Sequence, residues 1–361
     1  MANQPHLSFG LDPKYYTQAD IFEKENEKIF LQSWHMVGHT SQVANHGDYM
    51  SFHVFKENIF VVNSHGDLRA FYNVCPHRAH ELVEGKGNKK SIVCKYHAWS
   101  FSPEGKLLTA RGAEKTEGFE KSLYCLSQVR LEVFCGFLFI NLDNDAKPMT
   151  EVYPNVKERI YDMVPHIDTL LMSYQHTKQV TANWKVTVEN YNECYHCPNV
   201  HTAFSQSVVD PESYQIKPVD KVLYHTAKCH VEGKQAYEIA EGTEAYGSFY
   251  LWPTSSIQIY PGGVVNTYHW LPIAANNTLI YRSWFFENEE PTPEQMKIVE
   301  LDRTTTFDED IYLVNSVQRG LNSRGYKPGP IVMNPEGFAT TQSENATYAI
   351  KELVLEALGE I

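Results

Sequence analysis

The sequence predicts an α+β protein, with an all-β module near the N-terminus followed by a part in which helices accompany a second set of strands. Short runs rich in β-branched and aromatic residues, separated by Gly, Asn and Asp turns, fill residues 48–143 and return at residues 245–287. Apolar residues at helical spacing cover residues 17–34, 183–197 and 292–322. At about 150 residues per domain, a chain of 361 residues indicates two domains.

The first helical segment is amphipathic, with apolar residues separated by charged ones. Its apolar positions are Ile21, Phe22, Ile29, Phe30 and Trp34. Residues 150–180 are polar with a helical pattern, and we expect them to form the crossing into the second domain.

Composition and charge exclude several classes of protein. Hydrophobic residues make up 42% and charged residues 21% of the chain, as in an ordinary globular protein. The net charge of −13 argues against nucleic acid as a partner, because a phosphate backbone requires a basic surface. No apolar run approaches the roughly 18 residues of a membrane span. A polar start without a signal pattern and an odd count of 7 cysteines favour a reduced, cytoplasmic protein.

Two Cys-His pairs in the first strand set indicate a metal centre. The segment FYNVCPHRAH holds Cys75 and His77, and SIVCKYHAWSF, sixteen residues further on, holds Cys94 and His97. Zinc fingers usually place two cysteines in one pair and two histidines in the other. One thiolate and one imidazole from each turn instead suit a Rieske [2Fe–2S] cluster, in which two Cys bind one iron and two His bind the other. The β-rich surroundings also favour the cluster.

The run CPHRAH…CKYHAWSF resembles the Rieske motif, C-x-H-R-G…C-x-x-H-x-W, with all four ligands in place. Ala79 stands where the family usually has Gly. Because that glycine helps a tight turn, we expect a small backbone adjustment at Ala79. His80 fits no ligand position, and we place it beside the site or on the surface.

A second constellation lies in NWKVTVENYNECYHCPNVHTAF, which holds Glu193, His196 and His201. A helix would put Glu193 and His196 on one face, and Pro198 should break that helix before His201. Two neutral imidazoles and one carboxylate form the facial triad of mononuclear Fe(II) oxygenases, which leaves positions open for O2 and substrate.

The third ligand should be a carboxylate far along the chain. Asp308, Glu309 and Asp310 compete for this role within FDEDIYLVNSVQRGL. On a helix, Asp310 lies in register with an inward-facing apolar stripe, so we favour it over Asp308. The stripe consists of Leu313, Val314 and Val317.

The second segment resembles the catalytic motif of Rieske oxygenases, (D/E)-x-Y-H-x4-H, and the family pattern also places the iron ligand at Asp310. The resemblance implies that the Glu193 carboxylate links cluster ligand His97 of a neighbouring subunit to iron ligand His196. A carboxylate that accepts from both imidazole N–H groups fixes their tautomers and couples the two centres. Glutamate at this position is typical of the carnitine, glycine betaine and choline monooxygenase branch.

Cys194 and Cys197 form a C-x-x-C motif, which could indicate a thioredoxin-like or zinc site. No second C-x-x-C exists, and His196 between the two cysteines already has a role. We therefore expect packing cysteines.

The resemblance covers essentially the whole chain. It implies an N-terminal helix packing on the catalytic domain at residues 1–38, a Rieske domain at 39–148, and a catalytic domain of the helix-grip fold, with an antiparallel sheet, at 149–361. It further implies a terminal oxygenase that uses O2, and a homotrimer in which one subunit's cluster serves the next subunit's iron. The chain has no nucleotide motif, so a separate flavin- and ferredoxin-containing reductase that oxidises NAD(P)H is expected.

The substrate is predicted from the same branch and from aromatic residues. Aromatic faces attract a trimethylammonium group by roughly 0.5–2 kcal/mol per ring. The candidate pocket residues are Tyr191, Trp252, Tyr250 and Tyr268, with Trp270 and Trp284 near them. We expect N-demethylation or C–N cleavage of a small quaternary ammonium compound such as carnitine, glycine betaine or choline. An oxygenase for an aromatic or other small organic substrate and a non-catalytic Rieske electron carrier are the alternatives.

Overall fold

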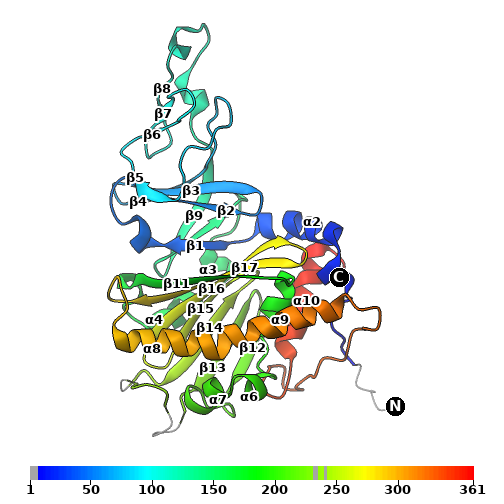
Figure 1. Ribbon diagram of the computed structural model, residues 1–361. Coiled ribbons are helices and arrows are strands. Elements are labelled where there is room, and N and C mark those ends of the chain that lie inside the picture. The colour runs from blue at the N-terminus through cyan, green and yellow to red at the C-terminus, as the bar shows by residue number, and fades with distance from the viewer. Residues whose placement is uncertain (1–6, 231–234, 240–241) are drawn as a thin grey trace. The chain divides into compact units, whose positions relative to one another are not determined.

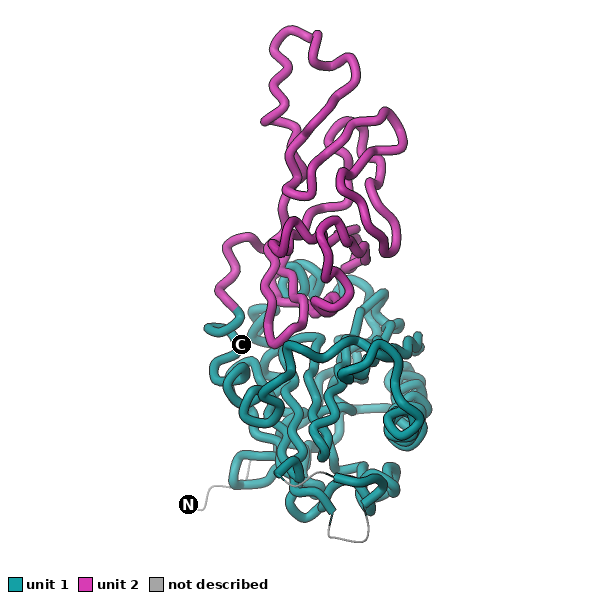
Figure 2. Tube along the Cα trace, turned by 90° about the vertical axis from the view of Figure 1, so that its left-hand side faces the viewer, with its two compact units in different colours: residues 1–31, 149–361 teal, residues 32–148 magenta. Residues whose placement is uncertain are grey.

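A computed structural model describes residues 7–230, 235–239 and 242–361. The chain divides into two compact units, shown in Figure 2. We call residues Gln32–Pro148 the small unit, and Met1–Leu31 together with Met149–Ile361 the large unit. Within the described residues, no helix combines the length and the apolar character that a membrane span requires.

The small unit is built from antiparallel strands, as the turn-rich β pattern predicts. Its larger sheet has seven strands in the order β1-β10-β9-β4-β3-β2-β5, and its smaller sheet has the order β6-β7-β8. The strands are β1 (His35–His39), β2 (Asp48–Val54), β3 (Glu57–Ser64), β4 (Asp67–Tyr72), β5 (Lys86–Asn88), β6 (Ile92–Val93), β7 (Ser100–Phe101), β8 (Leu107–Thr109), β9 (Gln128–Phe134) and β10 (Phe137–Asn141). Short 3-10 turns join them: η2 (Thr40–Val43), η3 (Ala113–Lys115) and η4 (Lys121–Tyr124).

The large unit contains a second seven-stranded antiparallel sheet, in the order β11-β17-β16-β15-β14-β13-β12. Its strands are β11 (Leu171–Val180), β12 (Gln215–Val219), β13 (Val222–Lys228), β14 (Ala245–Leu251), β15 (Ser255–Tyr260), β16 (Val264–Ala274) and β17 (Asn277–Phe286). The α+β prediction is confirmed.

Helices accompany this sheet, and Figure 1 shows α8 and α9 running one after the other across it. The helices are α1 (Lys14–Thr17), α2 (Ala19–Lys28), η1 (Phe30–Gln32), α3 (Met149–Val152), α4 (Val156–Met163), η5 (Ile167–Thr169), α5 (Trp184–Tyr191), α6 (Cys197–Val200), α7 (Thr202–Ser207), α8 (Pro293–Asp302), the π-turn η6 (Arg303–Phe307), α9 (Asp308–Leu321) and α10 (Asn345–Leu358).

The expected helical crossing at residues 150–180 is only half correct. Helices α3 and α4 form its first part, but Leu171–Val180 is the edge strand β11. Most of its side chains are partly or fully exposed, so the strand lacks the apolar alternation that distinguishes a half-buried strand from a polar helix.

Helix α5 is anchored at its first turn by the N-terminal helices. The Phe30 and Trp184 rings meet edge to face with centroids 5.2 Å apart. The Trp184 Nε1–H donates to Glu25 Oε2 at 2.9 Å, and Lys185 Nζ lies 2.5 Å from Glu25 Oε1. The Glu25 and Lys185 side chains are fully buried, so each charge depends on the other for compensation. These contacts fix the position of α5, and the candidate site lies directly after the C-terminal end of this helix.

Candidate metal centres

The two Cys-His turns of the small unit share one backbone design. Cys75 and Cys94 are buried, and the carbonyl of each accepts from the N–H of the alanine four residues later, Ala79 at 2.9 Å and Ala98 at 3.0 Å. Both alanines have positive φ, 55° and 58°. The expected adjustment at Ala79 is therefore a left-handed backbone conformation. Ala98 in the second turn adopts the same conformation.

The four side chains of these turns converge. Burial and the neighbouring Cys94 thiol raise the pKa of the Cys75 thiol, and the rings of His77 and His97 have centroids 4.6 Å apart. The His77 ring stacks on Trp99 at 4.7 Å. The buried Nδ1 of His97 has no hydrogen-bond partner among the residues that the structure describes. Two thiols beside two imidazoles, one with an unused buried nitrogen, fit the donor set of a Rieske cluster.

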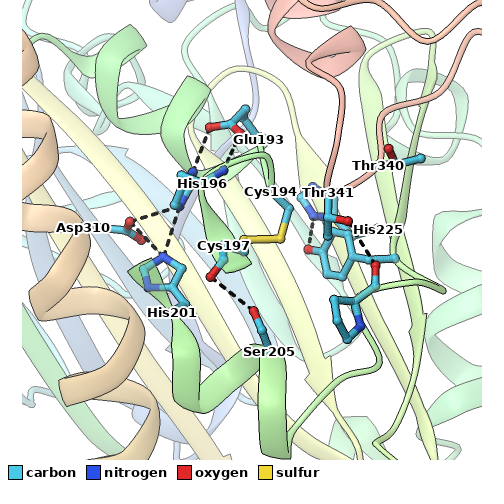
Figure 3. Close-up of a disulfide and its surroundings, with 12 residues drawn as sticks. Glu193, Cys194, His196, Cys197, His201, Ser205, His225, Asp310, Thr340 and Thr341 are labelled. Carbon is cyan, nitrogen blue, oxygen red and sulfur yellow. Dashed lines mark hydrogen bonds and ion pairs between the residues drawn. A yellow bond between two sulfur atoms is a disulfide. The ribbon is translucent and has the colours of Figure 1, made fainter. Parts of the chain in front are cut away.

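In the large unit, the neighbouring His196 and His201 and the distant Asp310 point at one spot (Figure 3). Asp310 Oδ1 lies 3.0 Å from His201 Nε2 and 3.4 Å from His196 Nε2. The two Nε2 atoms are 3.1 Å apart. All three ligand atoms lie within 4.8 Å of one another, as one metal ion requires. The donor set is the facial triad typical of non-haem iron.

Both imidazoles are held from behind by carboxylates. His196 donates to Glu193 twice, from Nδ1 to Oε2 at 2.7 Å and from its backbone N–H to Oε1 at 2.9 Å. His201 Nδ1 donates to Glu309 Oε2 at 2.8 Å. Because each Nδ1–H donates to a carboxylate, each Nε2 is the nitrogen that would bind a metal ion at the centre. Asp308 pairs instead with Arg303 at 3.2 Å.

The electrostatics of the triad favour positive charge. Burial opposes the protonation of His196, but Asp310 and Glu193 raise its pKa to about 10. Burial likewise acts to raise the pKa of Asp310, yet the facing His196 and His201 lower it to about 2. A point that stabilises added positive charge this strongly is suited to a divalent cation.

The local backbone around the triad differs from the predicted helix over 183–197. Helix α5 ends at Tyr191, and Asn192 caps it by donating from Nδ2 to the Val188 carbonyl at 2.7 Å. Glu193 and His196 therefore lie in a turn. Pro198 occupies the first turn of α6 rather than ending a helix, a position that proline favours.

The buried face of α9 also differs from the predicted stripe. Val314 is buried, but Val317 is 50% exposed, and Gln318 and Leu321 are buried in its place. The inward row from Asp310 thus follows a spacing of three to four residues. Gln318 is retained inside because it binds backbone groups of Tyr16 and Asn183.

The expectation of packing cysteines at Cys194 and Cys197 is not met, because the structure joins them in a disulfide (Figure 3). The turn between α5 and α6 brings their Cα atoms to 4.9 Å, within the range that a disulfide spans. Within the described part of the chain, Cys75, Cys94, Cys125 and Cys229 form no disulfide.

A cavity opens beside the triad. Its lining consists of Asn190, Tyr191, Glu193, Cys194, His196, Cys197, His201, Phe204, Tyr214, Tyr246, Gln258, Tyr260, Tyr268, Thr306 and Asp310. Of the predicted pocket residues, Tyr191 and Tyr268 line it. Tyr250 donates to the Pro253 carbonyl, and Trp252 packs against Trp184, so these two side chains belong to the packing around α5.

Sequence reasoning missed the aromatic cluster that forms the cavity wall. Phe204 lies on α7, one turn after His201, and its ring centroid lies 5.8 Å from that of Tyr246 and 5.9 Å from that of Tyr260. The Tyr214 and Tyr246 centroids are 5.7 Å apart. The sequence does show Tyr246 and Tyr260 within the strand runs of residues 245–287. Which face of the sheet they occupy depends on strand register, however, and the sequence does not give the register.

Comparison with known proteins supports both centres. The Rieske [2Fe-2S] domain family matches residues 33–123, and the catalytic domain of the ring hydroxylating alpha subunit matches residues 167–360. The carnitine monooxygenase oxygenase subunit of Escherichia coli (strain K12) is 37% identical over 344 residues, 94% of this chain and 91% of the relative. The glycine betaine monooxygenase oxygenase subunit of Pseudomonas aeruginosa (strain UCBPP-PA14) is 26% identical over 369 aligned positions. The alignment covers 90% of this chain and 85% of the relative.

A solved structure extends the likeness to three dimensions. It is a quaternary ammonium Rieske monooxygenase described in terms of carnitine oxidation by gut microbiota and inter-subunit electron transfer. It superposes with a TM-score of 0.90 at 33% identity, covering 98% of this chain and 96% of that one.

Proposed function

The chain belongs to the Rieske non-haem iron oxygenases, and from that premise we propose how its residues divide the reaction. It is the oxygenase subunit of a carnitine-type quaternary ammonium Rieske monooxygenase. The observation that carries the proposal is the His-His-Asp site beside a cavity walled by aromatic rings. We assign the cluster to residues 39–148 and the mononuclear iron to 149–361. Of the N-terminal segment 1–38, we assign the helices up to Leu31 to the catalytic domain, because His35–His39 is strand β1 of the small unit.

Cys75, Cys94, His77 and His97 would hold the [2Fe–2S] cluster, and His196, His201 and Asp310 would hold the iron. When bound, the cluster supplies electrons one at a time, and the iron supplies O2 activation. The chain's own contribution is positional. The two buried thiols fix one side of the cluster, and Glu193 fixes the tautomer of His196.

The cavity wall suits a cation that carries no N–H group. The hydroxyl of Tyr260 donates to Asp302 at 2.6 Å, that of Tyr214 to His225 at 2.9 Å, and that of Tyr191 bonds Ser248 and Ser256. These tyrosines line the cavity while their hydroxyls are engaged with protein groups. Aromatic rings attract a quaternary ammonium group, which needs no hydrogen-bond acceptor from the wall.

The expected product follows from where oxygen enters. Hydroxylation of a carbon bonded to the quaternary nitrogen consumes O2, two electrons and two protons and gives a carbinolamine. The carbinolamine loses its C–N bond to yield an aldehyde and a tertiary amine, which is N-demethylation or C–N cleavage, depending on which carbon is oxidised. Carnitine is the favoured substrate, since the similarity to the carnitine enzyme is higher than that to the glycine betaine enzyme.

The reaction needs an external source of electrons and a route for them to the mononuclear iron. An oxygenase subunit implies a reductase, and we propose one with flavin and ferredoxin centres that oxidises cytoplasmic NAD(P)H. We further propose a homotrimer in which Glu193 links His196 to His97 of the neighbouring subunit. Two features support this role. Each Glu193 oxygen has a second lone pair beyond its bond to His196, and the side chain lines the cavity beside the triad.

A substrate panel tests the function. The purified protein, loaded with iron and supplied with a compatible reductase and NADH, is offered carnitine, γ-butyrobetaine, glycine betaine, choline and an aromatic hydrocarbon. We expect oxygen uptake with release of trimethylamine or formaldehyde from a quaternary compound. Diol or phenol formation from the hydrocarbon alone would favour an aromatic-ring oxygenase instead. Cluster reduction without oxygen uptake on any compound would favour an electron carrier.

A further inference from the structure

A chain of buried side chains connects the cavity wall with the residue that precedes Glu193. The exposed fraction of each side chain is 5% or less. The members, in order, are Gln258, Tyr246, Tyr214, His225 and Asn192; Tyr246 and Tyr214 meet through their rings, and the other neighbours are hydrogen-bonded. Gln258, Tyr246 and Tyr214 line the cavity, whereas His225 and Asn192 lie behind it. This row of side chains therefore joins the wall of the substrate cavity to the segment that contains Glu193.

The direction of each hydrogen bond can be deduced. Asn192 Nδ2 donates to the Val188 carbonyl, so Asn192 Oδ1 must be the atom that accepts from His225 Nε2–H, at 2.9 Å. Burial lowers the pKa of His225 to about 3, which keeps the ring neutral with a single N–H. His225 Nδ1 is therefore an acceptor, and the Tyr214 hydroxyl donates to it at 2.9 Å.

The Tyr214 ring in turn packs against the Tyr246 ring, with centroids 5.7 Å apart. The Tyr246 oxygen accepts from Gln258 Nε2 at 2.7 Å, and Gln258 Oε1 accepts from Arg282 Nη2 at 3.2 Å. From Tyr214 to Val188 the hydrogen bonds all run in one direction, so none of them can reverse without breaking its neighbour's bond. Such a chain holds one arrangement.

We propose that His225 is a positioning residue that ties the substrate-cavity wall to the Asn192–Glu193 segment, with one hydrogen bond on each side of its ring. The Nδ1 side fixes Tyr214 and hence the shape of the wall. The Nε2 side fixes Asn192, the residue directly before Glu193, whose carboxylate holds His196. This inference rests on the proposed function, since it assigns the wall to substrate and Glu193 to electron transfer.

Two substitutions at His225 separate the two bonds. In His225→Gln, the side-chain amide can still donate to Asn192 but offers Tyr214 no acceptor at the Nδ1 position. In His225→Asn, the side-chain oxygen can still accept from Tyr214, but nothing reaches Asn192. Tyr214→Phe removes the same bond as His225→Gln, and Asn192→Leu removes the same bond as His225→Asn, each from the opposite partner.

The variants are purified as iron-loaded holoproteins and assayed in two ways. Steady-state kinetics with the best compound of the panel give KM and kcat. Rapid mixing of the reduced protein with O2 and that compound gives the rate of cluster reoxidation from its visible absorption. A buried neutral hydrogen bond corresponds to about a 2- to 12-fold change. We expect His225→Gln and Tyr214→Phe to raise KM by that factor while cluster reoxidation stays near wild type.

His225→Asn and Asn192→Leu should show the converse. KM should stay near the wild-type value, while kcat and cluster reoxidation fall by a similar factor with three irons per chain retained. If all four variants changed KM and reoxidation alike, in proportion to their loss of thermal stability, His225 would be a structural residue and the inference would be overturned. A wild-type protein that oxidises no compound of the panel counts against the proposed function instead, so the two failures are distinct.

Discussion

Glu309 Oε2 lies 2.8 Å from His201 Nδ1, on the side of the ring opposite the triad centre. The sequence offered Glu309 as a possible iron ligand, beside Asp308 and Asp310. The structure gives the three neighbouring carboxylates three different partners. Asp310 faces both imidazoles, Glu309 orients His201, and Asp308 binds Arg303.

Removal of Glu309 should weaken iron binding. In Glu309→Leu, His201 loses the acceptor that fixes its Nδ1–H tautomer, and loss of such a partner typically costs 10–100-fold in metal affinity. We expect the affinity for Co(II), titrated into protein freed of mononuclear iron, to fall by that factor. Asp308→Asn is the matched control, since it changes a carboxylate in the same turn that does not contact the imidazoles. Equal affinities for both variants would show that Glu309 is dispensable.

Ala79→Gly should stabilise the small unit. Ala79 has φ of 55°, and the left-handed region costs an L-residue roughly 1–2 kcal/mol. Glycine relieves this cost but adds entropy to the unfolded chain, so we expect a net gain of about 0.5–1 kcal/mol. Bleaching of the cluster absorption on heating measures it in the holoprotein. Ala44→Gly, at an exposed residue with φ of −70°, should bring no gain. A lower melting temperature for Ala79→Gly would contradict this account.

Much of the small unit could be predicted because its signals are local. Cys75, His77, Cys94 and His97 are named by spacing within two short runs, and each run folds into a turn largely through its own backbone hydrogen bonds. The left-handed conformation at Ala79 was also foreshadowed, since glycine usually occupies that position. Local spacing likewise named His196 and His201 within one segment, and the structure brings both together with Asp310.

The cavity could not be predicted in the same way, because its wall depends on sheet register. Tyr268 faces the cavity, whereas Tyr250 and Trp252 pack elsewhere, although all three occur in aromatic strand runs. Tyr250 and Tyr268 lie on the same face of the sheet, because both are directly opposite Ser256 on neighbouring strands, so the face alone does not decide which ring reaches the cavity. The polar edge strand β11 was missed for a related reason, since the pattern that identifies a strand requires a buried face.

Stability should depend on pH through Glu189. Burial raises the pKa of this carboxyl from 4.5 to about 7, against the opposing effects of the Tyr16 hydrogen bond and Lys185, while Glu344 adds to the rise. Between these two pH values the folded state binds more protons than the unfolded state. The free energy of unfolding should therefore fall as pH rises from about 4.5 to 7, by of order 2 kcal/mol.

Glu189→Gln tests this dependence, because the amide stays neutral and still accepts from Tyr16. The melting temperature of the variant should change less between pH 5 and 7.5 than that of the wild type. The variant should exceed the wild type in stability by the larger margin at the higher pH. Glu290→Gln, at an exposed carboxylate, provides the control and should leave the profile unchanged. Parallel profiles for all three proteins would mean that Glu189 is already ionised at pH 5.

Asp310→Ala should abolish turnover and remove one of three irons per chain, while the cluster spectrum stays. Its carboxylate is the one that meets both His196 and His201, so its loss leaves two neutral ligands and no compensating charge. Iron analysis alongside cluster absorption measures this outcome. Asp308→Ala should keep the iron, since that residue binds Arg303. The reverse result would move the ligand by two residues along α9.

The role of Glu193 can be tested apart from metal binding. Glu193→Ala should leave both centres occupied, and the cluster should still accept electrons from the reductase. Transfer from the cluster to the mononuclear iron should fall by orders of magnitude, because no carboxylate then connects the imidazole N–H groups of the two centres. Glu193→Asp keeps the carboxylate but shortens it by one methylene, so it should retain partial activity. Rapid-mixing absorption of the cluster follows the transfer directly.

A mixed oligomer then decides whether that transfer crosses between subunits. Protein with His97 replaced has a defective cluster, and protein with His196 replaced has a defective iron site, so each alone should be inactive. If Glu193 connects neighbouring subunits, mixing the two should restore activity, because some interfaces pair an intact cluster with an intact iron site. Subunit exchange is verified first with two affinity tags. No recovery after verified exchange would place electron transfer within one chain, even with every metal ligand assigned correctly.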